Sequence, residues 1–421
     1  MAKPKLPIPV TLLTGYLGSG KTTLINHVLS NQEGYKCAVI VNDIGEVNID
    51  AELIQKDENL VPLSNGCICC TLKVDLINQI AELVKSGKFD YILIEASGIC
   101  EPLPIAQSIA VLEGDEEEGT PAICRLDNIV TVVDALRMAT EFGCGDNLLK
   151  DDVDEEDIES LVIQQIEFCS TIILNKVDMV NEEQLGRVKA MIKTLQPKAK
   201  IIEANYGKVS VGDILNTNLY NFEETAGSAG WAQAYDKDED ERNEPHDHDE
   251  DEHEHHHHHD EDEHEHHHHH HHDDEDHSNC DHEHGHCCHH HHHGDDDEEY
   301  GIGTFVYHSR RPFNQEKLQE FVNNWPKGVV RAKGILWFSD KDKRDYLYVF
   351  EQAGVQITAT ENGKWLAAFP KSEQKKYFKE YPDIEEHWDE KYGDREIKLV
   401  FIGQHMDKPN IIERLDNCLD D

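Results

Sequence analysis

The sequence predicts an α/β protein in which a doubly wound parallel sheet is followed by a disordered His/Asp/Glu-rich linker and a small α+β C-terminal domain. Two observations lead to this fold class. Short apolar runs alternate with helical stretches through the first half of the chain, which is typical of a parallel sheet covered on both faces. A low-complexity tract then interrupts the chain, and strand-like runs return after it. We therefore expect domains at residues 1–225, 226–300 and 301–421.

The first predicted strand is the apolar run at residues 8–13, and a Gly-rich loop joins it to a helical stretch. This loop fits G-x-x-x-x-G-K-[ST] in the strand, loop, helix context that the pattern requires. Gly18 and Gly20 leave room for backbone N–H groups to surround a phosphate, which predicts a P-loop NTPase. We expect nucleotide contacts from Gly15, Tyr16, Leu17, Gly18, Ser19, Gly20, Lys21, Thr22 and Thr23, with Lys21 and Thr22 catalytic and Thr22 also a Mg²⁺ ligand.

The other strands of this sheet are expected in apolar runs at residues 37–41, 60–63, 91–94, 129–133, 171–174 and 200–202, with helices at 72–84 and 182–195. Ligands of parallel sheets bind beyond the carboxyl ends of the strands. Polar segments follow several of these runs, so we expect them to gather at one edge.

Glu95 directly follows the run at residues 91–94. A carboxylate at this strand end can bind Mg²⁺ or orient the attacking water, so we expect Glu95 to be catalytic. Gly98 would let the backbone approach a γ-phosphate closely, which makes residues 95–102 a candidate switch.

The segment Asn175, Lys176, Val177 and Asp178 follows another strand and predicts selection of guanine. The Asp178 carboxylate can accept hydrogen bonds from two N–H donors on one edge of guanine, whereas adenine offers no such pair. These four residues are therefore expected to contact the nucleotide, and GTP is the expected substrate.

Three cysteines, Cys67, Cys69 and Cys70, stand within four residues and directly after Gly66. Thiolates this close can bind one soft tetrahedral ion if the backbone turns sharply, as a glycine allows. The fourth position would be open to water, Glu46 or a protein ligand. Zn²⁺ fits best, while Cu(I) binds thiolate more tightly, and Ni²⁺ or Co²⁺ are also possible.

The formal net charge of −46 argues against a surface that holds nucleic acid or an anionic membrane. No apolar run reaches the roughly 18 residues of a membrane span, and the N-terminal residues lack a signal-peptide core. We therefore expect a cytoplasmic protein whose 12 cysteines are reduced thiols.

The low-complexity tract holds 25 of the 29 histidines between residues 246 and 293, interleaved with Asp and Glu. Such a segment cannot bury apolar surface and is expected to be disordered. Its imidazoles are available as ligands for Zn²⁺, Ni²⁺, Cu²⁺ or Co²⁺.

Beyond the tract, strands are expected at residues 303–307, 331–338, 346–350, 355–360 and 397–402, with helices at 315–324 and 410–418. This pattern predicts the small α+β domain.

The P-loop spelling at residues 15–23, the segments at 42–46, 66–70 and 95–98, and the Asn-Lys-Val-Asp segment together resemble the CobW-type GTPase metallochaperones. Within that family the chain is most similar to the zinc-regulated GTPase metalloprotein activators. The resemblance implies GTP hydrolysis, zinc at Cys67, Cys69 and Cys70, nucleotide contacts from Cys70, Thr71, Leu72 and Lys73, and delivery of metal to a client protein. Asp43 stands where the family has Glu.

The sequence thus predicts a GTP-hydrolysing metallochaperone that needs Mg²⁺ and transfers zinc to the apo-form of a client metalloprotein. The sequence leaves open whether the chain forms a homodimer. One alternative is a metal-storage or sensing protein that uses the His-rich tract. Another is a cobalt chaperone in cobalamin synthesis.

Overall fold

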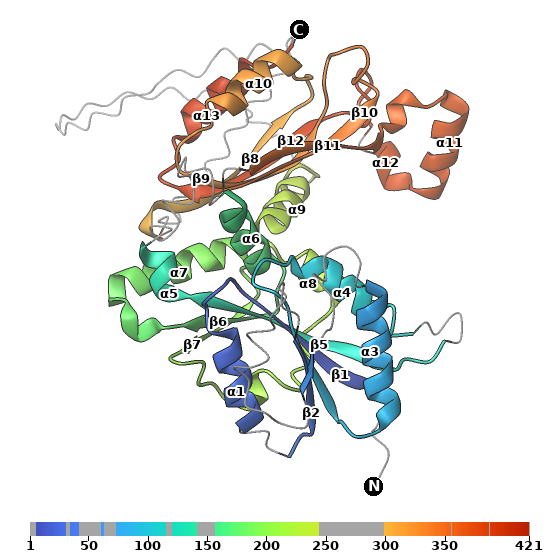
Figure 1. Cartoon of the computed structure of the whole chain (residues 1–421). Helices are drawn as coiled ribbons and strands as arrows, with labels where there is room; N and C mark the ends of the chain where they lie inside the picture. Colours follow the sequence, from blue (N-terminus) through green and yellow to red (C-terminus); the bar gives the residue numbers. More distant parts are fainter. Residues whose placement is uncertain are drawn as a thin grey trace, which may run out of the picture.

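The computed structural model describes residues 6–30, 34–41, 60–62, 73–114, 120–140, 156–243, 299–354, 356–386 and 388–420. Its elements form two sheets joined by a layer of helices (Figure 1). The first sheet has the strand order β3-β2-β4-β1-β5-β6-β7, and every pairing is parallel. Its strands are β1 (Ile8–Thr14), β2 (Cys37–Val41), β3 (Leu60–Pro62), β4 (Tyr91–Glu95), β5 (Cys124–Asp134), β6 (Thr171–Asn175) and β7 (Lys200–Ala204).

Helices cover both faces of this sheet, because its strands carry apolar side chains on both. On one face Val10 and Leu12 share a core with α3, α4, α5, α6 and α7. On the other face Leu13 packs with α1 and with apolar side chains of residues 211–215. The helices are α1 (Lys21–Ser30), α3 (Lys73–Ser86), α4 (Pro102–Ala110), α5 (Ala135–Thr140), α6 (Glu156–Glu167), α7 (Glu182–Leu195), α8 (Phe222–Ala226) and α9 (Gly230–Asn243).

The second sheet is antiparallel, with the order β11-β10-β9-β12-β8. Its strands are β8 (Ile302–Ser309), β9 (Val329–Leu336), β10 (Tyr346–Ala353), β11 (Gln356–Lys364) and β12 (Ile397–Gln404). The accompanying helices are α10 (Gln315–Asn323), α11 (Lys371–Glu380), α12 (Pro382–Glu386) and α13 (Lys408–Asp416). One face of the sheet packs with α10 and α13 in a core that includes Phe313, Phe401 and Leu415.

The opposite face of the second sheet lies on the first domain, above α6, α7 and α9 (Figure 1). Val330, Val400 and Ile402 belong to the same apolar cluster as Val10 and Leu12 of the parallel sheet. The two sheets are therefore held together by one continuous hydrophobic core, built through the helices between them.

The predicted fold class, a doubly wound parallel sheet with a separate α+β domain after it, is confirmed. One expectation needs correction. Residues 226–300 were expected to be disordered, yet residues 230–243 form α9, in which Trp231 and Tyr235 pack against the shared core. Lys398 of β12 donates a hydrogen bond of 2.6 Å to the carbonyl oxygen of Tyr235. The histidine tract lies outside the described residues.

Candidate functional site

The Gly-rich loop runs from the end of β1 to the start of α1, and two of its glycines are fixed by close contacts. Gly15 has φ 132°, and a Cβ there would lie 2.3 Å from the carbonyl oxygen of Val132. Gly20 has φ 109°, and its Cβ would lie 2.4 Å from Nδ2 of Asn175. Larger residues are excluded at both positions by conformation and by space. The loop is thereby held tightly against β5 and β6.

Lys21 is 7% exposed, and its ammonium group is held by the loop itself. Nζ donates hydrogen bonds of 2.7 Å to the carbonyl oxygen of Gly15 and 3.2 Å to that of Tyr16. The positive charge therefore lies where the backbone of the loop curves. An anion bound in the loop would meet this charge together with the N-terminus of α1.

Two oxygen-bearing side chains meet beside the loop. The Thr22 hydroxyl donates to Oε1 of Glu95 at 3.3 Å, and the Glu95 side chain is 2% exposed at the end of β4. Ser19 Oγ is also buried, and among the described residues no hydrogen-bond partner for it is found. A hydroxyl and a carboxylate are oxygen ligands of the kind that Mg²⁺ takes, so the residues present fit the ion.

Asn175 joins the guanine-selecting segment to the phosphate loop. Its Nδ2 donates to the carbonyl oxygen of Ser19 at 2.9 Å, and its Oδ1 accepts the backbone N–H of Gly207 at 3.1 Å. The side chain is 2% exposed. Asn175 therefore acts as a brace between three loops, and its amide is already used by the protein.

Lys176 and Asp178 follow in a short 3-10 turn. Lys176 adopts φ 61°, and its ammonium forms an ion pair with Asp134 at the end of β5. The Asp178 carboxylate is on an exposed residue, and its backbone N–H donates to Oδ1 of Asn205 at 3.0 Å. Asn205 was not among the predicted site residues. Its signal was its place directly after β7, at the same sheet edge.

Gly98 brings the candidate switch against the phosphate loop. A Cβ at Gly98 would lie 2.8 Å from the backbone nitrogen of Leu17. The carbonyl oxygens of Gly98 and Cys100 both accept hydrogen bonds from Nε2 of Gln165, at 3.4 and 3.1 Å. The structure thus places the predicted Glu95 and Gly98 beside the P-loop.

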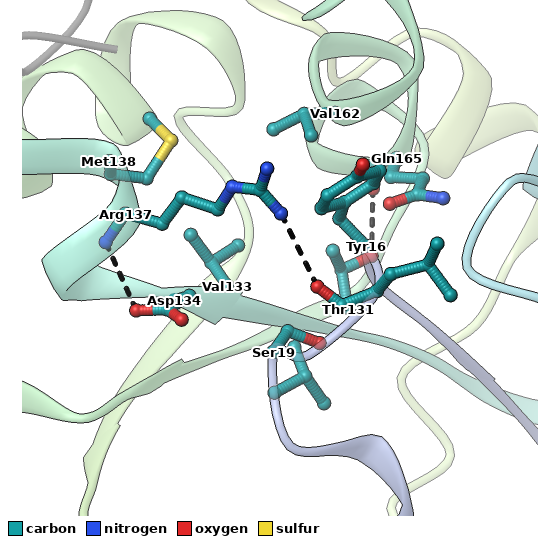
Figure 2. Close-up of a pocket in the computed structure, with 11 residues that line it drawn as sticks. Tyr16, Ser19, Thr131, Val133, Asp134, Arg137, Met138, Val162 and Gln165 are labelled. Carbon is teal, nitrogen blue, oxygen red and sulfur yellow. Dashed lines mark hydrogen bonds between the residues drawn. The ribbon is translucent and has the colours of Figure 1, made fainter. Parts of the chain in front are cut away.

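Arg137, another residue that the sequence did not single out, covers the loop from the side of α5 (Figure 2). Its guanidinium lies 4.3 Å from the ring centroid of Tyr16 and donates to the carbonyl oxygen of Leu17 at 3.5 Å. Its backbone N–H is bound by Asp134 at 3.1 Å. These side chains line a pocket next to the P-loop.

The predicted metal motif lies outside the described residues, as do Glu46, Thr71 and Leu72, while Lys73 begins α3. Five cysteines are described, and all are buried: Cys37, Cys100, Cys124, Cys169 and Cys418. Burial raises the pKa of Cys37, Cys124 and Cys169 to about 12 and that of Cys418 to about 11. These four thiols are protonated at neutral pH, which disfavours metal binding.

Within the described ranges, no group of three or more His, Cys, Asp or Glu side chains is arranged to hold a metal ion. Likewise, none of the helices seen in these ranges is both long and apolar enough to cross a membrane.

The parallel sheet, the phosphate loop, the strand-end glutamate and the Asn-Lys-Val-Asp turn define a P-loop GTPase. The chain belongs to the CobW/HypB/UreG family: the nucleotide-binding domain of that family matches residues 9–203, and the Cobalamin synthesis protein cobW C-terminal domain matches residues 302–419. It is 33% identical to Zinc-regulated GTPase metalloprotein activator 1 of Dictyostelium discoideum over 441 residues, which cover 98% of this chain and 80% of that protein.

Two further similarities are shorter or more distant. Zinc chaperone CobW of Pseudomonas aeruginosa is 35% identical over 231 residues, which cover 50% of this chain and 60% of that protein. The crystal structure of Zn(II)-bound YjiA GTPase from E. coli aligns with 99% of this chain and 100% of that chain, with 19% identity and a TM-score of 0.39.

Proposed function

We propose that the protein is a metallochaperone that uses GTP hydrolysis to control the binding of zinc and its transfer to a client metalloprotein. The observation that supports this most directly is the meeting of the P-loop, the switch segment and the guanine-selecting turn at one sheet edge. The names of relatives, a zinc-regulated GTPase metalloprotein activator and a zinc chaperone, agree with this function.

In this proposal GTP lies along the loop between β1 and α1, with its triphosphate on the backbone N–H groups of residues 15–23. Lys21 exchanges its bonds to the Gly15 and Tyr16 carbonyl oxygens for phosphate oxygens. Thr22 and Glu95 would hold Mg²⁺, which when bound would neutralise charge on the phosphates. Glu95 also orients the attacking water, and Gly98 brings the backbone of the switch to the γ-phosphate.

The base is read by residues 175–178. Asp178 accepts the N–H donors of guanine, and the stem of Lys176 lies along the base while its ammonium stays paired with Asp134. Asn175 holds these residues at the correct distance from the phosphate loop.

We propose that zinc binds to Cys67, Cys69 and Cys70, with Glu46 or a client side chain as the fourth ligand. Burial raises the pKa of Cys37, Cys124, Cys169 and Cys418, which disfavours those four thiols as ligands. Cys70, Thr71, Leu72 and Lys73 would contact the nucleotide as well, so the two sites would share residues. The histidines at 246–293 would collect metal ions for this site.

The deciding experiment is steady-state GTP hydrolysis with and without one equivalent of Zn²⁺. The protein should lack residues 244–298, so that the histidines do not compete for metal while α9 is kept. We expect zinc to change turnover and Cys67→Ser to abolish this response. Cys418→Ser, at a buried thiol of the C-terminal domain, should keep it.

Turnover that ignores zinc would make the cysteine cluster a passive site and favour metal storage. Storage also predicts several ions per chain, mostly lost on deletion of residues 244–298. A second measurement compares zinc affinity with a GTP analogue, with GDP and without nucleotide. Equal affinities would contradict control by GTP, since a ligand that binds two states equally shifts neither.

A further inference from the structure

The last turn of α6 lies between the nucleotide loops and the second sheet, and it carries two buried polar side chains. Gln165 is 1% exposed and Glu167 is 7% exposed. Burial of such groups costs free energy unless they form hydrogen bonds. Their partners therefore indicate what this turn does.

Gln165 is bonded to the nucleotide side. Its side-chain Nε2 donates the two hydrogen bonds to the carbonyl oxygens of Gly98 and Cys100. Its backbone carbonyl oxygen accepts the Thr131 hydroxyl at 2.7 Å (Figure 2). The Thr131 hydroxyl in turn lies 2.8 Å from that of Thr14, the residue directly before the P-loop. One glutamine thus touches the switch backbone and is linked to the start of the phosphate loop.

Glu167 is bonded to the second sheet. Its Oε1 and Oε2 accept hydrogen bonds from Nε and Nη2 of Arg331 at 2.8 and 3.0 Å. Arg331 lies in β9, is 3% exposed and also donates to the carbonyl oxygen of Gln352 in β10 at 3.2 Å. The fork-to-fork pair fixes both direction and distance, so β9 and β10 are tied to the end of α6.

Gln165 and Glu167 are separated by one residue of the same helical turn, so a displacement of the backbone of this turn would move both. We propose that Gln165 is a positioning residue for GTP hydrolysis, and that the turn containing Gln165 and Glu167 couples the switch to the C-terminal sheet. A protein that binds the C-terminal sheet and displaces β9 would alter turnover and nucleotide affinity through this turn. Nucleotide would alter the binding of that protein by the same factor as the protein alters nucleotide affinity. The inference rests on the GTPase activity of the site.

The first test compares Gln165→Met with Gln164→Met. Methionine keeps the length of glutamine but has no N–H donor. Gln164, one residue earlier, bonds Ser160 within the same helix at 3.3 Å and makes a matched control. Since we propose that the backbone at Gly98 approaches the γ-phosphate, we expect Gln165→Met to lower kcat about 10- to 100-fold and to weaken binding of a GTP analogue. GDP affinity should stay within about twofold, which a mere loss of folding would not allow.

The second test measures coupling with a double-mutant cycle in the full chain. The combined Glu167→Gln and Arg331→Met change removes both charges without leaving one buried alone. We expect it to lower kcat about 2- to 30-fold and to add little in the Gln165→Met background. Arg331→Lys, which keeps the opposite charges but loses the bidentate geometry, serves if the combined protein does not fold.

Three results would be informative in different ways. If the unaltered protein does not hydrolyse GTP, the proposed function fails and so does this inference. If the unaltered protein hydrolyses GTP and Gln165→Met has the same kcat, Gln165 does not position the switch. If the losses from the two sets of changes multiply in the combined variant, the two ends of the turn act independently and the coupling is wrong.

Discussion

The side-chain amide of Asn175 donates a hydrogen bond of 2.9 Å to the carbonyl oxygen of Ser19, so the segment that we propose reads the base is joined to the Gly-rich loop that we propose holds the phosphates. The same side chain accepts the N–H of Gly207 at 3.1 Å. These two hydrogen bonds within the protein therefore explain why an asparagine occupies position 175.

Asn175→Ala should weaken GDP and GTP binding together, about 10- to 100-fold. The change removes both bonds and leaves buried partners unsatisfied, at a cost of about 1–3 kcal/mol each. Titration with fluorescent nucleotides measures the effect. Asn181→Ala, which removes the capping box of α7, should lower stability but leave affinity unchanged. Unchanged affinity in Asn175→Ala would contradict the bracing role.

Asp178→Asn should change base preference. In the proposed complex the Asp178 carboxylate would accept two N–H donors of guanine, whereas an amide can donate to the C2 carbonyl oxygen of xanthine. We expect GTP to bind about 10- to 100-fold more weakly and XTP to bind more tightly, as competition assays would show. Asp213→Asn, at an exposed pair with Lys200, is the control. If Asp178→Asn lowered the affinities for GTP and XTP equally, Asp178 would not read the base.

Gly98→Ala tests the contact between the switch and the P-loop. The new Cβ would lie 2.8 Å from the nitrogen of Leu17, so one segment must move. We expect kcat for GTP to fall at least about 10-fold, since near-ångström displacements of reacting groups are costly. Gly212→Ala is the control: its new Cβ would lie 3.8 Å from Ser210 Oγ, an ordinary van der Waals contact, so kcat should not change. A fully active Gly98→Ala protein would show that the switch does not need this close approach.

Alkaline pH should destabilise the fold through its buried thiols. Burial raises the pKa of Cys37 from 9.0 to about 12, so between these values the folded protein keeps a proton that the unfolded chain loses. This contribution to stability is complete below pH 9.0 and is lost as the pH rises toward 12.

Urea denaturation at several pH values in this window gives the slope of stability against pH. Cys37→Ala should make the slope of stability against pH shallower. Ala38→Gly, a neighbouring buried change without a titrating group, should lower stability but keep the slope. Identical slopes for the unaltered protein and Cys37→Ala would contradict the raised pKa.

Much of the nucleotide domain could be predicted because its signals are local. The helix at 182–195 was expected with the bounds that α7 has, since apolar periodicity is reinforced by the capping box of Asn181 and Gln184. The P-loop glycines were predicted from spacing alone. The structure adds the reason for Gly15 and Gly20, which is contact with β5 and β6.

What could not be predicted depends on partners distant in sequence. The helix α9 was expected to be disordered, because its few apolar residues find their partners in β8 and β12 far along the chain. Gln165 and Arg137 are polar residues whose roles follow from neighbours 65 and 120 positions away. The predicted ligands Glu46, Cys67, Cys69 and Cys70 lie outside the described residues and remain predictions.

The shared core has a consequence for a chain that is cut between its two domains. Because Val330, Val400 and Ile402 complete the same apolar cluster as Val10 and Leu12, neither domain has a finished surface without the other. A chain cut after α9 would expose the apolar sides of α6, α7 and α9 to solvent, which favours aggregation or proteolysis over an independent GTPase. The C-terminal domain therefore contributes to the stability of the nucleotide domain as well as to its own.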